Sequence, residues 1–230
     1  MTNILLNSYR FDAPWLQEGL QDYLHPGMVV TVFPLAFRVG ELTGSADWEA
    51  RYNKETGPFA QGLKTSFGAY GISPAQIEWV NPFEPARFSL PERIAASDVL
   101  YFCGGLPDLM LRRLTELGLV ERLRQFDGVV MGDSAGALIQ FDTYHVSPDR
   151  DYPGFQYHSG LGYLREFEIE VHYEGLPIQE ESIDQVVSQR GLPVYGLYVD
   201  GALVVDQGTV TPLGRVKRFF TAAESAGTAS

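Results

Sequence analysis

Residues 129–137 read Val129-Val130-Met131-Gly132-Asp133-Ser134-Ala135-Gly136-Ala137, and their pattern is the starting point for predicting the fold. An apolar run passes at once into small residues, which is typical of a buried strand that turns sharply into a helix. Apolar runs that are continuous rather than alternating suit a parallel sheet, whose strands are covered on both faces. The stretch therefore predicts a strand, a tight turn and a helix that begins near Ala135.

Short apolar runs of the same kind recur along the chain and alternate with segments whose apolar residues have helical spacing. Strands are predicted at residues 4–6, 28–33, 77–80, 99–102 and 129–131, and helical segments at residues 15–24, 48–70 and 106–126. Strands that alternate with helices predict an α/β fold with a doubly wound, mostly parallel sheet.

After about residue 160 the pattern changes. Residues 167–171 alternate polar with apolar side chains, as a half-buried strand does, and residues 178–189 read as a helix. Short strands are predicted at residues 194–199, 202–205, 209–210 and 216–219, joined by turns that include Asp200-Gly201 and Gln207-Gly208. We expect this part to extend the sheet with a small antiparallel C-terminal section.

The length and composition suit one globular domain. The 230 residues are 45% hydrophobic, which predicts a single α/β domain over residues 1–220, with a small polar tail, 221–230, that we expect to be disordered. A net charge of −12 argues against nucleic-acid and anionic-membrane partners, which bind basic faces. One cysteine, no basic leader and no long apolar run predict a cytoplasmic protein, and a monomer or a homodimer fits equally.

Ser134 is the candidate nucleophile. In G-x-S-x-G between a strand and a helix, the sharp turn strains the serine and lifts its hydroxyl out of the backbone. The free N–H groups at the helix start, including that of Ala135, can then stabilise a developing oxyanion. The alternative is a tight connection in which Ser134 only caps the helix.

A second glycine turn follows the strand at residues 99–102. Gly104 and Gly105 come directly after it and lead into a helix. Because the carboxyl ends of parallel strands meet at one edge of a sheet, these glycines are expected near Ser134, where Gly105 can give a second oxyanion N–H. The alternative is a plain helix-entry turn.

A serine nucleophile needs a base within hydrogen-bond reach. Of the four histidines, His172 ranks first because it follows the strand at residues 167–171 and so is held rigidly at the site edge. His158 ranks second and His145 third, since both lie in a polar, Tyr-rich stretch. His25 belongs to a turn with Pro26 and Gly27.

A carboxylate should orient the histidine. Asp200 is preferred because it follows the apolar run 194–199 and so is expected at a strand end, although Asp200-Gly201 also fits a simple hairpin turn. Other candidates are, upstream of His172, Asp142, Asp149 and Asp151, and, downstream, Glu174 and Asp184. An upstream acid would suit an α/β-hydrolase-like esterase.

Together these residues resemble the dipeptidase E family of serine peptidases, peptidase family S51, which also contains cyanophycinases. The motifs that carry the resemblance are Cys103-Gly104-Gly105, Gly132-Asp133-Ser134-Ala135-Gly136-Ala137, Gly160-Leu161-Gly162 and Val171-His172-Tyr173. The resemblance implies a flavodoxin-like sheet related to class I glutamine amidotransferases and a triad of Ser134, His172 and Asp200. It also implies oxyanion N–H groups from Gly105 and Ala135. No cofactor is expected, and no metal either, because the spacing of Asp149, Asp151 and His158 matches no rigid ligand pattern.

The resemblance further predicts the ligand, a small peptide, for which Gly104, Asp133 and Tyr173 are candidate contacts. Members specific for N-terminal aspartate carry arginines after the catalytic histidine, whereas residues 176–187 here contain no arginine. Because an aspartyl side chain needs a positive pocket, we expect a specificity that is not strictly aspartyl. A non-catalytic binding protein on the same scaffold is the remaining alternative.

Overall fold

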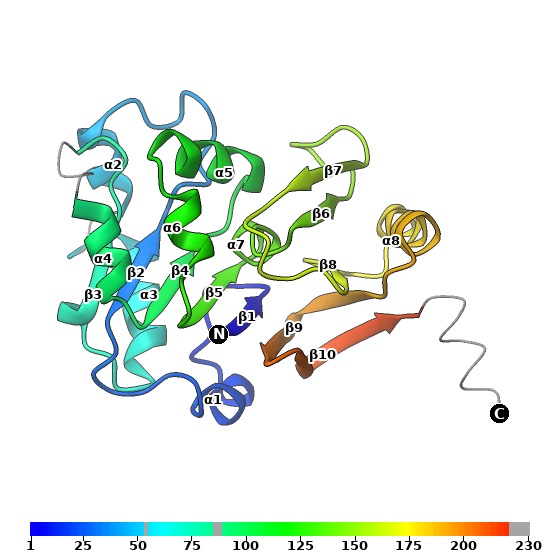
Figure 1. The fold of residues 1–230 in the computed structure, drawn as a ribbon, viewed down its shortest axis with the longest axis horizontal. Coiled ribbons are helices and arrows are strands. Elements are labelled where there is room, and N and C mark those ends of the chain that lie inside the picture. Colours follow the sequence, from blue (N-terminus) through cyan, green and yellow to red (C-terminus); the bar gives the residue numbers. More distant parts are fainter. Residues whose placement is uncertain (53–54, 85–88, 221–230) are drawn as a thin grey trace.

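The computed structural model describes residues 1–52, 55–84 and 89–220, so the predicted tail, 221–230, lies outside the described residues. An eight-stranded sheet runs in the order β10-β9-β1-β5-β4-β2-β3, with β8 beside β9 (Figure 1). The strands are β1 (Thr2–Leu6), β2 (Val30–Phe33), β3 (Ile77–Trp79), β4 (Val99–Phe102), β5 (Val129–Asp133), β6 (Thr143–Val146), β7 (Gln156–Ser159), β8 (Glu168–Glu170), β9 (Val194–Asp206) and β10 (Thr209–Phe219). The helices are α1 (Pro14–Leu20), α2 (Ser45–Tyr52), α3 (Pro58–Gly68), α4 (Leu90–Ala96), α5 (Pro107–Glu116), α6 (Val120–Arg124), α7 (Ala135–Leu138) and α8 (Pro177–Arg190), with a 3-10 turn at Pro74–Gln76.

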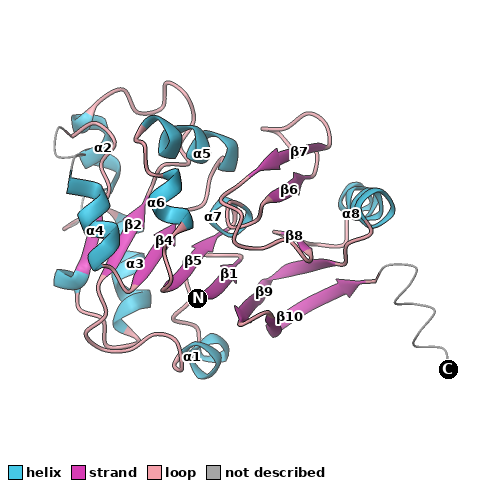
Figure 2. Cartoon of the chain, viewed as in Figure 1, coloured by secondary structure: helices cyan, strands magenta, loops and turns pink. Residues whose placement is uncertain are grey.

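The parallel half of the sheet confirms the predicted doubly wound fold. Strands β1, β5, β4, β2 and β3 pair in parallel, and helices cover both faces (Figure 2). Along β4, Val99 and Tyr101 pack into the core that contains α1, α2 and α3, whereas Leu100 and Phe102 pack into the core that contains α4 to α7. Burial on both faces explains why these strands read as continuous apolar runs.

The predicted helical segments are shorter in the structure than in the sequence pattern. The segment 48–70 contains parts of two helices, α2 and α3, and the segment 106–126 is divided at Gly118, whose φ of +70° ends α5. Helix α7 spans only Ala135–Leu138. Among the described residues, no helix has the length and apolar character needed to cross a bilayer.

Strand β9 corrects the prediction of a turn at Asp200-Gly201. It continues without a break from Val194 to Asp206, and Asp200 therefore lies inside a strand rather than at a strand end. Gly201 lets the strand pass close to its neighbour, since a Cβ there would overlap the Arg215 carbonyl oxygen, where β10 has a bulge. The second predicted turn is present, with positive φ at Gln207 and Gly208.

Strand β9 also aligns the ends of two other strands. Its second half pairs antiparallel with β1, and its first half pairs in parallel with β8. The carboxyl ends of β1 and β8 therefore point at each other along β9, and Asn7 and His172 follow these ends. Because β1 also pairs with β5, His172, two residues after β8, lies at the edge of the sheet where β5 turns into α7.

Candidate active site

Ser134 forms the turn between β5 and α7. Its φ is +52° and its ψ −112°, a strained conformation for a residue with a side chain, and its N–H donates to the Leu6 carbonyl at 2.9 Å. The neighbouring glycines permit the turn: a Cβ on Gly132 would lie 2.5 Å from the Gly136 backbone, and one on Gly136 would overlap the Phe102 carbonyl. The predicted strand, turn and helix are thus present.

His172 is the histidine that the structure brings to Ser134. Its Nε2 lies 2.9 Å from Ser134 Oγ. The residue has a φ of +52°, and its backbone is held from both sides, because its N–H donates to Asn7 Oδ1 at 2.7 Å and its carbonyl accepts from Gln179 Nε2 at 2.9 Å. The first-ranked base candidate is therefore in contact with the candidate nucleophile.

The protein around His172 favours a neutral ring. Desolvation lowers the pKa of His172, and the carboxylates of Glu170 and Glu174 act in the opposite direction without overcoming it. A neutral imidazole can accept a proton through Nε2 when its own proton is on Nδ1. At neutral pH the ring is thus in the protonation state that a general base requires.

The two oxyanion candidates lie in the same cavity as this pair. Gly105 and Ala135 line a cavity of about 250 Å³ together with Ser134 and His172. Gly105 has a φ of +135°, and a Cβ there would overlap the Ala36 carbonyl oxygen, so only glycine fits. The backbone placement agrees with an oxyanion role for both residues, which remains a prediction.

Asp133 and Gly104 line a second, larger cavity of about 530 Å³, which Ser134 and His172 also line. The Asp133 carboxylate is buried, and it accepts hydrogen bonds from Tyr101 Oη at 2.7 Å and from the Gly104 N–H. Burial raises the pKa of Asp133 to about 6, although both hydrogen bonds lower it. Asp133 therefore ties the end of β4 to the Ser134 turn.

Asp200 does not contact His172. Val199 lines the second cavity with Ser134 and His172, and side chains alternate along a strand, so Asp200 points to the opposite face of β9. There its Oδ1 lies 3.7 Å from Arg215 Nε. Among the described residues, the hydrogen bonds of His172 go to Ser134, Asn7 and Gln179, and none goes to a carboxylate. The acid role of Asp200 stays a prediction that this geometry does not support.

The other histidines and the upstream acid candidates make their contacts with groups other than Ser134 and His172, although His145 and Asp149 line the first cavity together with that pair. His145 is buried between Glu168 and Glu170, at 2.7 and 2.9 Å, and His158 packs against Tyr144 and Tyr152. The upstream carboxylates have other partners: Asp142 lies near Arg165, Asp149 accepts backbone N–H groups of its own loop, and Asp151 pairs with Arg38.

Tyr173 and Cys103 are both buried. The Tyr173 ring packs with Tyr198 and Phe219, and its hydroxyl donates to Glu180 Oε1 at 2.8 Å, so its side chain lines neither cavity. The Cys103 thiol is buried, and burial followed by the charge of Asp133 raises its pKa. A protonated, buried thiol is a poor nucleophile. Within the described residues, no cluster of side chains has the arrangement of a metal site.

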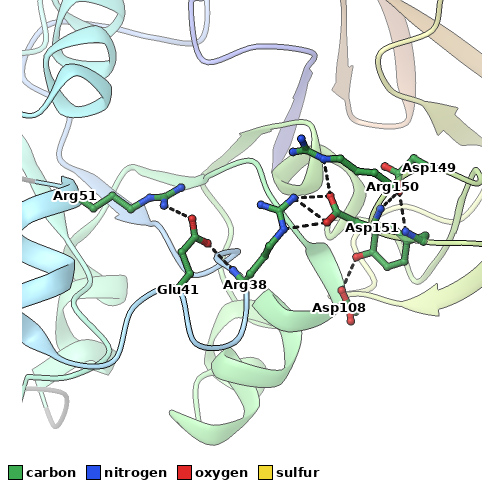
Figure 3. Close-up of polar contacts among 8 residues, drawn as sticks. Arg38, Glu41, Arg51, Asp108, Asp149, Arg150 and Asp151 are labelled. Atoms are coloured by element: carbon green, nitrogen blue, oxygen red, sulfur yellow. Dashed lines mark hydrogen bonds and ion pairs between the residues drawn. The ribbon is translucent and has the colours of Figure 1, made fainter.

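A charged network at the rim of the site was missed in the sequence (Figure 3). Arg38, Arg51 and Arg150 line a third cavity of about 280 Å³ with Ser134 and His172. Arg38 forms a bidentate pair with Asp151 at 2.6–2.9 Å, Arg51 pairs with Glu41, and Arg150 Nε donates to Asp151 at 3.3 Å. Tyr152 donates to Asp108 at 2.5 Å and anchors the same loop to α5. Positive side chains thus reach the site from segments far from His172 in sequence.

Three further residues support the pair and were also missed. Asn7 could have been found by the argument used for His172, since it directly follows the apolar run 4–6. Glu170 and Gln179 gave no signal, because their contacts depend on β6 and α8 both lying beside β8 in space. Gln179 Nε2 donates both to the His172 carbonyl and, at 3.3 Å, to Glu170 Oε1.

Comparison with known proteins gives the family. The profile of peptidase family S51 matches residues 49–213. No curated protein matches the chain. Two similar solved structures are a "Putative Peptidase E Protein" from Listeria monocytogenes EGD-e (18% identity, TM-score 0.64, covering 95% of this chain and 98% of that one) and a peptidase from an acI-B1 Actinobacterium (17% identity, TM-score 0.65, covering 96% and 94%). At these identities the two structures show a shared fold. Because the family profile spans most of the chain, the protein belongs to peptidase family S51 and is a serine peptidase.

Proposed function

We propose that the protein hydrolyses small peptides through an acyl-enzyme on Ser134, with His172 as general base. The observation that carries the proposal is the 2.9 Å contact between His172 Nε2 and Ser134 Oγ. It joins a serine in a strained strand-to-helix turn to an imidazole whose pKa is lowered, which are the two conditions for an activated hydroxyl.

The reaction then follows from the positions of these groups. Ser134 Oγ bonds to the scissile carbonyl carbon while its proton passes to His172 Nε2, and the N–H groups of Gly105 and Ala135 take the oxyanion charge. The C–N bond breaks as His172 returns the proton to the leaving amine. A water molecule, deprotonated by His172, attacks the ester carbonyl and releases the acid, and Ser134 recovers its proton.

Specificity is proposed to be broader than strictly aspartyl. The arginines that line the site are paired with carboxylates: Arg38 with Asp151, Arg51 with Glu41, and Arg150 also with Asp151. An acidic substrate side chain would have to displace one of these partners, which costs part of the binding energy.

Peptide turnover tests the proposal. We expect the wild-type protein to cleave members of a dipeptide and tripeptide library, and Ser134→Ala to lose at least ~10³ in kcat/KM. Ser188→Ala, on the exposed face of α8, is the matched control and should behave as wild type. Turnover that persists in Ser134→Ala would refute the nucleophile. Cleavage confined to peptides with N-terminal aspartate would refute the broad specificity.

A further inference from the structure

A buried chain of charged groups lies directly beside the candidate base. Glu168 and Glu170 are two residues apart on β8 and so face the same side, where His145 of β6 lies between them. His145 Nδ1 is 2.7 Å from Glu168 Oε2, and His145 Nε2 is 2.9 Å from Glu170 Oε2. Arg190, at the end of α8, pairs with the second oxygen of Glu168.

The histidine in this chain is a cation. Burial alone lowers the pKa of His145, but the hydrogen bonds and charges of Glu168 and Glu170 outweigh it and raise the pKa to about 9. A doubly donating imidazolium fixes the Glu170 carboxylate in place. Ser147, the residue after β6, donates through Oγ to the same Glu170 oxygen at 2.8 Å, so β6 and its C-terminal end hold this carboxylate at two points.

Glu170 is coupled to His172 in two ways. Gln179 Nε2 bridges Glu170 Oε1 and the His172 carbonyl, so the position of the carboxylate and that of the base depend on one amide. Glu170 and His172 also line the same cavity with Ser134, and the Glu170 charge acts on the His172 ring. Glu170 is only 6% exposed, so little water surrounds its carboxylate, whereas the His172 residue is exposed and water screens part of the interaction there.

Other charged groups face His172 but are placed differently. Glu174 is exposed, Asp133 accepts hydrogen bonds from the β4 end, Asp149 accepts backbone N–H groups of its own loop, and the other charges at the rim are paired with one another. These rim groups are Arg38, Glu41, Arg51, Asp149, Arg150 and Asp151. Asp200 lies near Arg215 and makes no hydrogen bond with His172 among the described residues. Glu170 is thus the buried carboxylate that His145 and Gln179 hold beside the base.

We propose that Glu170, held by His145 and Gln179, is a positioning residue that stabilises the imidazolium of His172 during the reaction. This rests on the proposed role of His172 as base. The Glu170 charge favours the protonated ring that forms as Ser134 attacks. The hydrogen bond from Gln179 holds the strained His172 backbone in place. The oriented acid of a Ser-His-Asp triad would be replaced by a carboxylate that acts through space and through the backbone.

The titration of His172 tests the proposal. In Glu170→Gln, the His172 imidazole, followed by NMR, should titrate about 0.5–1 pH unit lower, as expected for losing one nearby, partly screened charge. The acid limb of kcat/KM should move by the same amount, and kcat should fall about tenfold. Glu170→Asp, which keeps the charge, should restore the titration, and Glu181→Gln, on the exposed side of α8, should leave it unchanged.

An unchanged His172 titration in Glu170→Gln would overturn the proposal, even if activity fell, because a structural role alone moves no pKa. If Glu170→Gln does not fold, Gln179→Ala takes its place. Losing the amide that holds Glu170 beside the base should lower the His172 pKa, and no fall would overturn the proposal. The NMR titration needs no turnover, so a protein without peptidase activity would refute the proposed function separately from this inference.

Discussion

Asp133 lies beside the nucleophile, and ionisation of its carboxyl group destabilises the folded protein. Its folded-state pKa of about 6 lies above the 3.8 of an ordinary aspartate, because burial disfavours the charge. A carboxyl group with a raised pKa contributes stability below pH 3.8 and loses that contribution as the pH rises through 6. At pH 7 the native protein therefore carries a buried carboxylate at a cost on the order of 3 kcal/mol.

Replacing Asp133 by asparagine should stabilise the protein at neutral pH. The amide can still accept from the Gly104 N–H, and its NH₂ group can donate to the Tyr101 hydroxyl, which then acts as acceptor. We expect Asp133→Asn to unfold at a higher urea concentration than wild type at pH 7.5, by about 1–3 kcal/mol, with a smaller difference at pH 4.5. Equal or lower stability of the variant at pH 7.5 would contradict the assignment of a costly charge.

Some of the candidate site residues could be predicted from the sequence, and others could not. Ser134 was predictable because the glycines at 132 and 136 are needed wherever a strand and helix pass this closely. His172 was predictable from its place after a strand. Asp200 was not, because two apolar runs with Asp-Gly between them look like a hairpin, and only the pairing of β9 with both β8 and β1 keeps the strand continuous.

At the scale of elements, β9 determines where the catalytic pair meets. It pairs with β1 and with β8 so that their carboxyl ends face each other, which lets Asn7 accept from the His172 N–H, and it passes close to β10 at Gly201. No short-range pattern contains this information, since β1 and β9 lie almost a whole chain length apart in sequence. The parallel strands were predictable because burial on both faces marks each of them separately.

Gly201 tests the role of β9. A Cβ at this position would overlap the Arg215 carbonyl, which is backbone and cannot move aside easily. We expect Gly201→Ala to lose about 1–3 kcal/mol in chemical unfolding. Gly68→Ala, at the end of α3 with open space around its Cα, is the control and should be neutral or slightly stabilising. A Gly201→Ala protein as stable as wild type would show that β9 does not need this close approach.

At the scale of the whole molecule, the His145 network joins the β6–β7 sheet, β8 and α8 into one body around the site. The folded-state pKa of His145, about 9, lies above the 6.5 of an ordinary histidine. The stability it supplies is therefore complete below pH 6.5 and is lost as the pH rises through 9. The stabilisation that His145 loses across this pH range is on the order of 3 kcal/mol.

This dependence can be measured as the difference between wild type and His145→Gln. The wild-type free energy of unfolding should fall between pH 6.5 and 9.5 more steeply than that of the variant, so that the two values converge at alkaline pH. His25→Gln, in an exposed turn, is the matched control and should follow wild type. A constant difference across this range would mean that His145 is neutral in the folded protein.

The central claim is that His172 activates Ser134 for attack, and covalent labelling tests it most directly. After incubation with a fluorophosphonate, mass spectrometry of the intact protein and its peptides should show one adduct, on Ser134. His172→Gln should slow its formation by at least ~10². Cys103, which is buried and protonated, should not react with a thiol reagent under the same conditions. An adduct on another residue, or no adduct in a preparation that still cleaves peptides, would contradict the account.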